Sequence, residues 1–178
     1  MNYAIFLRGI NTGGLTIKMS ELKTVLQPLA FEKIQTILAT GNLLIQTTLP
    51  ADAALQQVID CLSAHFQTPI SGLIRTESEV RELLHDIVTD VPATHNQMVL
   101  FTNAELYPEL VAEFETFPHD AYECLKKTSG HDLLWVVKKG ETTKNFGGKV
   151  LGKAKYKPLL TSRNLTTIRK IVAAFDNF

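Results

Sequence analysis

Apolar positions along residues 2–76 alternate between short continuous runs and stripes that recur every three or four residues. Short β-branched and aromatic runs are typical of buried strands, and apolar side chains at helical spacing are typical of amphipathic helices. Between two of the runs stands Thr40-Gly41-Asn42, a composition that favours a tight hairpin turn. The pattern predicts strands at 2–8, 34–39, 43–47 and 69–75 and helices at 18–29 and 52–66.

The βαββαβ order of these segments matches the ferredoxin-like arrangement, in which two helices cover an antiparallel sheet. We therefore predict an α+β protein whose first half, residues 1–76, is a ferredoxin-like unit. In this topology we place the loop after the first strand and the hairpin between the second and third strands at opposite edges of the sheet. Asn11 and Thr40 are consequently not expected to share one pocket.

A second series of the same kind follows an acidic helix predicted at 77–88 and a linker-like turn at 91–94. It consists of a strand, a helix, two strands and two C-terminal helices, predicted at 97–102, 104–114, 122–127, 133–138, 142–153 and 162–175. We predict a second α+β half at 77–178, a βαββ-type unit with basic C-terminal helices. No sequence repeat is strong enough to demonstrate a duplication.

Composition indicates a folded protein without a membrane segment. Of 178 residues, 45% are hydrophobic and 20% charged, which suits one domain or two small ones. No run approaches the ~20 apolar residues of a membrane helix, and no basic segment precedes the short apolar stretch near the start. We expect a cytoplasmic protein with no membrane partner. Cys61 and Cys124 are too few for a disulfide framework and too far apart for a CxxC site.

Charge divides the chain strongly although its net charge is zero. Residues 1–123 carry 6 Lys and Arg against 15 Asp and Glu, a balance of −9, and residues 124–178 carry 12 against 3, a balance of +9. Lysines are densest in one segment, at Lys138, Lys139, Lys144, Lys149, Lys153, Lys155 and Lys157. This segment could attract an anionic partner, or it could dock on the acidic part of the chain or form a solvated face.

Two glycine-rich segments resemble phosphate-binding loops to different degrees. Residues 7–14 run from a predicted strand through a glycine-rich loop towards a helix, so that N–H groups could face an anion, although glycines there could simply allow positive φ. Residues 147–154 match G-x-x-x-x-G-K but end in Ala154, where a P-loop has the hydroxyl that holds Mg²⁺. No strand directly precedes them. We interpret them as a basic, glycine-interrupted helix and not as an NTPase site.

The segment Thr161-Ser162-Arg163-Asn164 is expected to open the last helix. Thr161 or Ser162 can cap that helix, and an arginine beside free N–H groups would suit a phosphate or carboxylate. Capping accounts for the hydroxyl residues but not for Arg163 followed by Asn164.

The other reactive residues indicate no site. The five histidines lack HxxxH or HxH spacing, so no metal site is predicted and surface or core positions are expected. Cys61, Cys124 and Trp135 lie in or beside apolar stripes or strands, which favours burial over catalysis. No GxSxG motif occurs, and the patterns identify no cofactor.

Four segments share their order and residues with one known pattern. They are LRGINTGG at 7–14, Lys18-Met19 with Glu21-Leu22, ATGNLLI at 39–45 and LTSRNLTTI at 160–168. Together they resemble the bacterial domain-of-unknown-function family 1697, whose pattern is close to LRGINVGG, M-x-x-L, SGN and TTRNWNT, over nearly the whole chain. This sequence departs from the pattern at Thr12, Thr40, Ser162 and Leu165, and the last departure removes an indole at the head of the final helix.

The resemblance implies candidate ligand-binding residues but no assigned activity. Carried over by position, the candidates and the glycines that shape the backbone are Arg8, Gly9, Asn11, Gly13, Gly14, Lys18, Thr40, Gly41, Asn42, Thr161, Ser162, Arg163 and Asn164. Arginines, amides and hydroxyls without a required carboxylate, His or Cys suit recognition of an anion better than acid–base chemistry.

Our leading hypothesis is a module that binds a phosphorylated or anionic ligand, a nucleotide or the backbone of nucleic acid, with Arg8 and Arg163 on one surface. Few aromatic residues interleave the lysines, which favours a small nucleotide or nonspecific binding. Two alternatives stay open. One is a small enzyme acting on an anionic metabolite, and the other is an interaction protein that self-associates through its acidic and basic regions. The sequence leaves the oligomeric state open.

Overall fold

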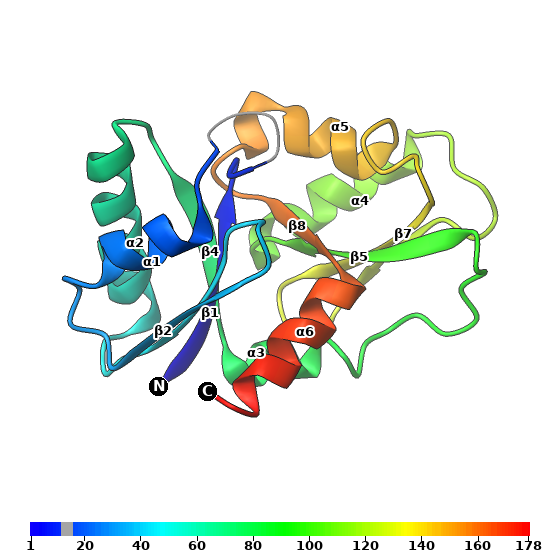
Figure 1. Cartoon of the computed structure of the whole chain (residues 1–178). Helices are drawn as coiled ribbons and strands as arrows, with labels where there is room; N and C mark the ends of the chain where they lie inside the picture. Colours follow the sequence, from blue (N-terminus) through cyan, green and yellow to red (C-terminus); the bar gives the residue numbers. More distant parts are fainter. Residues whose placement is uncertain (12–15) are drawn as a thin grey trace. The chain divides into compact units, whose positions relative to one another are not determined.

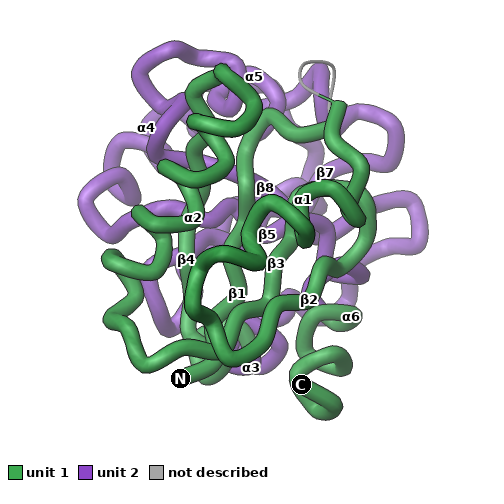
Figure 2. The backbone as a smooth tube through the Cα atoms, turned by 60° about the vertical axis from the view of Figure 1, so that its left-hand side comes forward, with its two compact units in different colours: residues 1–80, 169–178 green, residues 81–168 purple. Residues whose placement is uncertain are grey.

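The structure is a computed structural model that describes residues 1–11 and 16–178. Two compact units divide the chain, one formed by residues 1–80 with 169–178 and the other by residues 81–168 (Figures 1 and 2). We call them unit 1 and unit 2. Each contains one four-stranded antiparallel sheet with helices, so the predicted α+β class is confirmed.

Unit 1 has the predicted βαββαβ order followed by a short helix. Its elements are β1 (Asn2–Arg8), α1 (Met19–Leu26), β2 (Lys33–Ile37), β3 (Asn42–Gln46), α2 (Ala51–Phe66), β4 (Ser71–Thr76) and α3 (Glu77–Glu82), whose last two residues already belong to unit 2. The strand order is β2-β3-β1-β4, which is that of a ferredoxin-like sheet. The predicted hairpin of β2 and β3 is confirmed, with Ile34 opposite Ile45.

The core of unit 1 lies between its sheet and the helices α1 and α2. Alternate residues of β1 enter this core, because side chains of a strand point to opposite faces in turn. Tyr3, Ile5 and Leu7 are each at most 2% exposed. They pack with the apolar stripes of the two helices, Leu22, Leu26, Ala54, Val58 and Leu62.

Unit 2 repeats the plan of unit 1. Its elements are β5 (His95–Phe101), the 3-10 helix η1 (Ala104–Leu106), α4 (Tyr107–Glu115), β6 (Cys124–Lys127), β7 (Leu133–Lys138), α5 (Phe146–Gly152), the 3-10 helix η2 (Ala154–Tyr156), β8 (Thr161–Asn164) and α6 (Leu165–Phe175). The strand order β6-β7-β5-β8 is the counterpart of β2-β3-β1-β4. The division between the units falls within α6, after Ile168.

The strand β8 differs from the sequence prediction, which makes residues 161–164 the start of the last helix. They pair with β5 so that Arg163 lies opposite Val99. The cap of α6 is Asn164 and not a preceding hydroxyl residue, because its Oδ1 accepts hydrogen bonds from Thr167 N at 2.7 Å and Thr167 Oγ1 at 2.8 Å. A short polar strand lacks the apolar alternation by which strands are predicted.

The end of β4 shows the same arrangement as the end of β8. Arg75 is the penultimate residue of β4, as Arg163 is of β8, and each donates a 2.7 Å hydrogen bond from Nη1 to the carbonyl of the residue before it. The next residue then caps a helix, since Thr76 Oγ1 accepts from Glu79 N at 3.2 Å just as Asn164 accepts from the third residue after it. The two units thus share this local arrangement as well as their strand order.

The helix predicted at 77–88 ends earlier, at Glu82. Gln97 of β5 explains this, because its side chain accepts from Val88 N at 3.0 Å and donates to Val88 O at 2.8 Å. These bonds fasten the Val88 backbone to β5, whereas a helix over 77–88 would direct the Val88 N–H to the carbonyl of Leu84.

The P-loop-like segment forms α5 and the turn after it. Asn145 has extended backbone and its Oδ1 accepts from Phe146 N at 2.6 Å, so the helix begins at Phe146 and not at the predicted residue 142. The interpretation of residues 147–154 as a glycine-interrupted helix is confirmed for 147–152.

Candidate functional site

The loop after β1 and the β2–β3 hairpin lie together at one end of the unit 1 sheet. Asn11 Nδ2 donates a 2.6 Å hydrogen bond to the carbonyl of Ala39, and Leu7 N donates to Gly41 O at 2.8 Å. The expectation that the two segments lie at opposite edges is therefore wrong. Because β3 is antiparallel to both β1 and β2, the first two strands end on the same side. We call residues 8–11, 17–18 and 38–42 the loop end.

Asn11 fastens the two flanks of the β1–α1 connection to each other. Its Oδ1 accepts from Ile17 N at 2.8 Å, and its Nδ2 donates to Ile17 O at 2.9 Å as well as to Ala39 O. Both N–H donors of the amide are thus used within unit 1. Asn11 therefore positions the loop, which is a different role from the direct ligand contact implied by the family resemblance.

Asn42 organises the hairpin in a similar way. It is 1% exposed, and its Nδ2 donates to Ile37 O at 2.9 Å and to Thr40 Oγ1 at 3.0 Å. Gly41 has φ of +70°, and a Cβ there would lie 3.0 Å from Leu7 Cβ, so the turn requires glycine. Thr40 itself is exposed at the turn.

Left-handed backbone is concentrated at the loop end. Gly9, Asn11, Leu38 and Gly41 have φ of +71°, +57°, +58° and +70°. Only three other described residues have positive φ, and none of them is at the loop end. Left-handed conformation is unfavourable for residues other than glycine, and such backbone gathers at functional sites. It marks the loop end as the strongest candidate site.

Two cationic side chains belong to the loop end. Arg8 is the last residue of β1 and lies opposite Ser71 of β4. It is half-buried, and burial lowers the pKa of its guanidinium without removing its charge at neutral pH. Lys18 is exposed at the start of α1, where its side chain makes no capping bond. Gly13 and Gly14, also candidates from the sequence, lie outside the described residues.

Unit 2 contains the four C-terminal candidates, Thr161, Ser162, Arg163 and Asn164. Arg163 is 9% exposed, and burial lowers its pKa to about 10, so it stays cationic at neutral pH. Its Nη1 donates to Thr161 Oγ1 at 3.0 Å as well as to Ser162 O. The equivalent Arg75 in unit 1 favours a structural role for these contacts. Ligand binding by Arg163, and a surface shared with Arg8, stay predictions.

Part of the lysine-rich segment docks on acidic residues of its own unit. Lys153 bonds the carboxylate of Glu113, and Lys155 Nζ lies 2.5 Å from Glu109 Oε1 and 3.1 Å from Glu113 Oε1. Tyr156 OH donates to the same Glu113 carboxylate at 2.8 Å. This network joins α4 to η2, so two of the seven lysines serve to stabilise unit 2.

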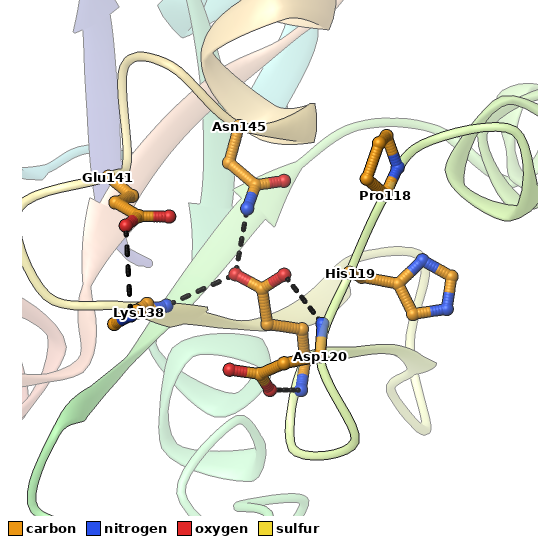
Figure 3. A pocket seen from close by; sticks show the side chains of 7 residues that line it. Pro118, His119, Asp120, Lys138, Glu141 and Asn145 are labelled. Carbon is orange, nitrogen blue, oxygen red and sulfur yellow. Dashed lines mark hydrogen bonds and ion pairs between the residues drawn. The ribbon is translucent and has the colours of Figure 1, made fainter.

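A second candidate is an open pocket of about 280 Å³ in unit 2 (Figure 3), lined by Pro118, His119, Asp120, Glu123, Lys138, Glu141 and Asn145. Glu123 is its buried carboxylate, at 7% exposure. Its Oε1 accepts from Asn145 Nδ2 at 2.8 Å and Lys138 N at 3.2 Å, and its Oε2 accepts from Asp120 N at 3.3 Å. Glu123 thus ties the end of β7 and the start of α5 to the loop before β6.

Asp120 of this pocket is bonded to a buried histidine. His95 Nε2 lies 3.0 Å from Asp120 Oδ2, and His95 Nδ1 lies 3.0 Å from Thr94 Oγ1. The hydrogen bond from the backbone of Tyr122, followed by that of His95, lowers the pKa of Asp120. Both carboxylates, Asp120 and Glu123, are therefore engaged by donors of unit 2, which makes this pocket the weaker candidate.

Sequence reasoning does not single out Leu38, Glu123 or Arg75. Leu38 falls inside a predicted strand, and leucine carries no signal for left-handed backbone. Glu123 is one of 15 Asp and Glu in the first 123 residues, and nothing in the sequence distinguishes it from the others. A signal for Arg75 does exist, since Arg75-Thr76 and Arg163-Asn164 each place an arginine before a cap-forming residue.

Metal and thiol chemistry find no support in the part of the chain that the structure describes. No group of three or more His, Cys, Asp or Glu side chains there could hold a metal ion. Cys61 and Cys124 are half-buried free cysteines, and burial raises the pKa of both thiols, which opposes their activation as nucleophiles.

Within residues 1–11 and 16–178, no helix has both the length and the apolar character needed to cross a bilayer.

The fold defines an α+β protein of two ferredoxin-like units. The chain belongs to the family described as "Protein of unknown function (DUF1697)", whose model matches residues 1–129, and the resemblance drawn from the sequence is confirmed. A solved structure described as "The structure of conserved bacterial protein SP0830 from Streptococcus pneumoniae" is similar over 97% of each chain, with a TM-score of 0.71 and 24% identity. At that identity the likeness concerns the fold. The comparison with curated proteins gave no match.

Proposed function

We propose that the protein binds an anionic ligand, with phosphate esters as the main class, at the loop end of unit 1. The observation that carries this proposal is the position of the half-buried Arg8 among four residues with left-handed backbone. At a non-glycine residue this conformation costs on the order of 1–3 kcal/mol. Leu38 bears that cost at the same end of the sheet as Asn11, a residue that adopts left-handed backbone more readily, and a ligand-binding role would explain the strain at Leu38.

Positive charge is available at the same end. The chain from Arg8 to Asn11 spans at most ~11 Å, and Asn11 is bonded to Ile17, the residue before Lys18. The first N–H groups of α1 add partial positive charge, which Glu21 in the first turn reduces in part. A small doubly charged anion suits this set of groups.

The comparison of the two units supports the same assignment. By the register of the two sheets, Asn103 of unit 2 stands where unit 1 has Arg8. Asn103 caps η1 by accepting from Leu106 N at 3.2 Å, and the buried Asp132 accepts from Thr102 N at 3.0 Å. The equivalent end of unit 2 thus has a carboxylate and no arginine at these positions, which favours unit 1 as the anion-binding unit.

Calorimetric titration of the protein with inorganic phosphate, pyrophosphate and AMP at low salt tests the proposal. We expect Arg8→Gln to weaken binding ten- to hundredfold, because a charge-assisted hydrogen bond contributes ~1.5–3 kcal/mol. Arg75→Gln is the matched control, since Arg75 is also half-buried in unit 1 but lies opposite Ala4, towards the other end of the sheet. No binding by the folded parent protein, or equal losses in both variants, would contradict the proposal.

The backbone of nucleic acid is the alternative source of phosphate. Lys139, Lys144, Lys149 and Lys157 are exposed and form no ion pair with any residue that the structure describes. Titration with a short single strand over a range of salt concentrations separates the two cases. A slope of log K against log salt that is steep and falls in Lys149→Gln indicates a nucleic acid, and a shallow slope that Lys149→Gln leaves unchanged indicates a small ligand.

A further inference from the structure

A leucine with left-handed backbone stands at the tip of the β2–β3 hairpin. Leu38 follows β2 directly, has φ of +58° and is 43% exposed. Glycine, asparagine and aspartate adopt this conformation more readily, and an exposed position rewards a polar side chain. Other exposed large apolar residues of the described chain, Met1, Tyr122 and Leu159, have no positive φ. Leucine is thus unfavourable at this position for two reasons, its left-handed backbone and its exposed apolar side chain.

Leu38 also adjoins the proposed anion site. The next residue, Ala39, accepts the 2.6 Å hydrogen bond from Asn11, and Asn11 in turn holds Ile17 beside Lys18. The loop end therefore contains an exposed apolar side chain, Leu38, besides the cationic side chains of Arg8 and Lys18. Such a combination suits a ligand with a charged part and an apolar part.

We infer that Leu38 is a specificity-determining residue that contacts an apolar group of the ligand. This inference rests on the proposed function and narrows its ligand class. The ligand is then an anion that carries an aromatic or aliphatic group, for example a nucleotide or an aryl phosphate, and not a free inorganic ion. Arg8 meets the charge, and Leu38 loses exposed apolar area when the apolar group binds.

Phenyl phosphate and inorganic phosphate share the charged group and differ by the phenyl ring, so the ratio of their dissociation constants isolates the apolar contact. We expect the parent protein to bind phenyl phosphate at least about tenfold more tightly than phosphate. Leu38→Gly removes the side chain and relieves the left-handed strain. In this variant the preference should fall to less than about twofold, phosphate affinity should stay within about twofold, and the thermal midpoint should rise by about 2–4 °C.

If Leu38 contributed only to folding, Leu38→Gly would lower the thermal midpoint and leave the preference for phenyl phosphate over phosphate unchanged. Leu38→Asn, which also tolerates left-handed backbone, should reproduce the loss of preference. Leu159→Gly is the control, because Leu159 is an exposed leucine of unit 2 and its removal should leave the preference unchanged. If the parent binds phosphate but shows the same preference as Leu38→Gly, the inference is overturned and the proposed function stands. If the folded parent binds neither compound, both are overturned.

AMP, titrated alongside, distinguishes a nucleobase from a simpler aromatic group. A preference for either ester over phosphate that depends on Leu38 supports the inference, and the ester with the larger Leu38-dependent preference identifies the apolar group. Absence of such a preference for both esters overturns it.

Discussion

Gly147 of α5 lies against the indole ring of Trp135 in β7, with no room for a side chain between them. A Cβ added at Gly147 would lie 2.5 Å from Cε3 of Trp135, well inside van der Waals contact. Both residues are buried. Glycine within a helix is unfavourable by ~1 kcal/mol relative to alanine, so the close approach of helix and strand accounts for it. Packing thus explains Gly147, the first glycine of the segment that resembles a P-loop.

Gly147→Ala should therefore destabilise the protein in spite of its better helix propensity. We expect the free energy of unfolding to fall by ~1–3 kcal/mol, because the indole cannot move without disturbing a filled core. Gly152→Ala, in the same helix, is the control, since a Cβ there would meet nothing within 4 Å and the change should be neutral or slightly stabilising. Urea unfolding measures both, and a Gly147→Ala variant as stable as the parent would show that the ring has room to shift.

Asn11 offers a test of how the loop end is held. Asn11→Gly keeps a residue that tolerates φ of +57° but removes the three side-chain hydrogen bonds. We expect it to cost ~1–2 kcal/mol and to speed hydrogen exchange at the Ile17 amide, which is left without its acceptor. Asn11→Ala should cost ~1 kcal/mol more, because alanine also bears the left-handed strain. Unchanged exchange at Ile17 in Asn11→Gly would contradict the role assigned to the Asn11 amide.

Acid should weaken unit 2 through Glu113. Burial alone would raise the pKa of Glu113, but hydrogen bonds from Lys153, Tyr156 and Lys155 outweigh burial and lower it from 4.5 to about 2. Because the pKa of Glu113 is lower in the folded protein than in the unfolded chain, the ionised carboxylate stabilises the folded state fully above pH 4.5. This stabilisation is lost as the pH falls towards 2.

We expect Glu113→Gln to lower the free energy of unfolding at pH 7 by ~1 kcal/mol, a modest value because both lysines are partly exposed. The difference from the parent should shrink steadily below pH 4.5. Glu115→Gln is the control on the same helix, because the exposed Glu115 forms no ion pair with any described residue. Urea unfolding at several pH values measures the difference in free energy of unfolding between Glu113→Gln and the parent. If this difference did not depend on pH, the ion-pair network of Glu113 would not be its cause.

The fold was predictable wherever a local pattern decides the structure. The continuous apolar run of β1 and the turn around Gly41 each depend on residues adjacent in the sequence, and both were predicted correctly. Strand β8 depends on pairing with the distant β5, and its four polar residues carry no alternation. The end of α3 likewise depends on Gln97, a residue of another strand. Contacts between distant residues therefore set the limit of the prediction.

The candidate site was predictable in its residues and not in its geometry. Arg8, Asn11 and Thr40 follow from the family resemblance, but the expectation that the loop after β1 and the β2–β3 hairpin lie at opposite edges of the sheet was wrong. The roles also differ from expectation, because hydrogen bonds of Asn11 and Asn42 act within unit 1. Leu38 could not be found, since only the backbone shows that it is left-handed.

The two helix caps that follow the equivalent arginines should make matched contributions in the two units. Asn164→Ala removes the acceptor of Thr167 N, and Thr76→Ala removes the acceptor of Glu79 N. We expect a loss of ~1 kcal/mol for each. The backbone N–H of Thr76 also donates to Glu79 Oε2 at 2.7 Å, which completes a capping box, and Thr76→Ala leaves this bond in place. Asn164→Asp keeps the acceptor and should restore most of the stability that Asn164→Ala loses. Urea unfolding of the four proteins, the parent included, measures these differences, and equal losses in Asn164→Asp and Asn164→Ala would mean that the residue acts otherwise than as a cap.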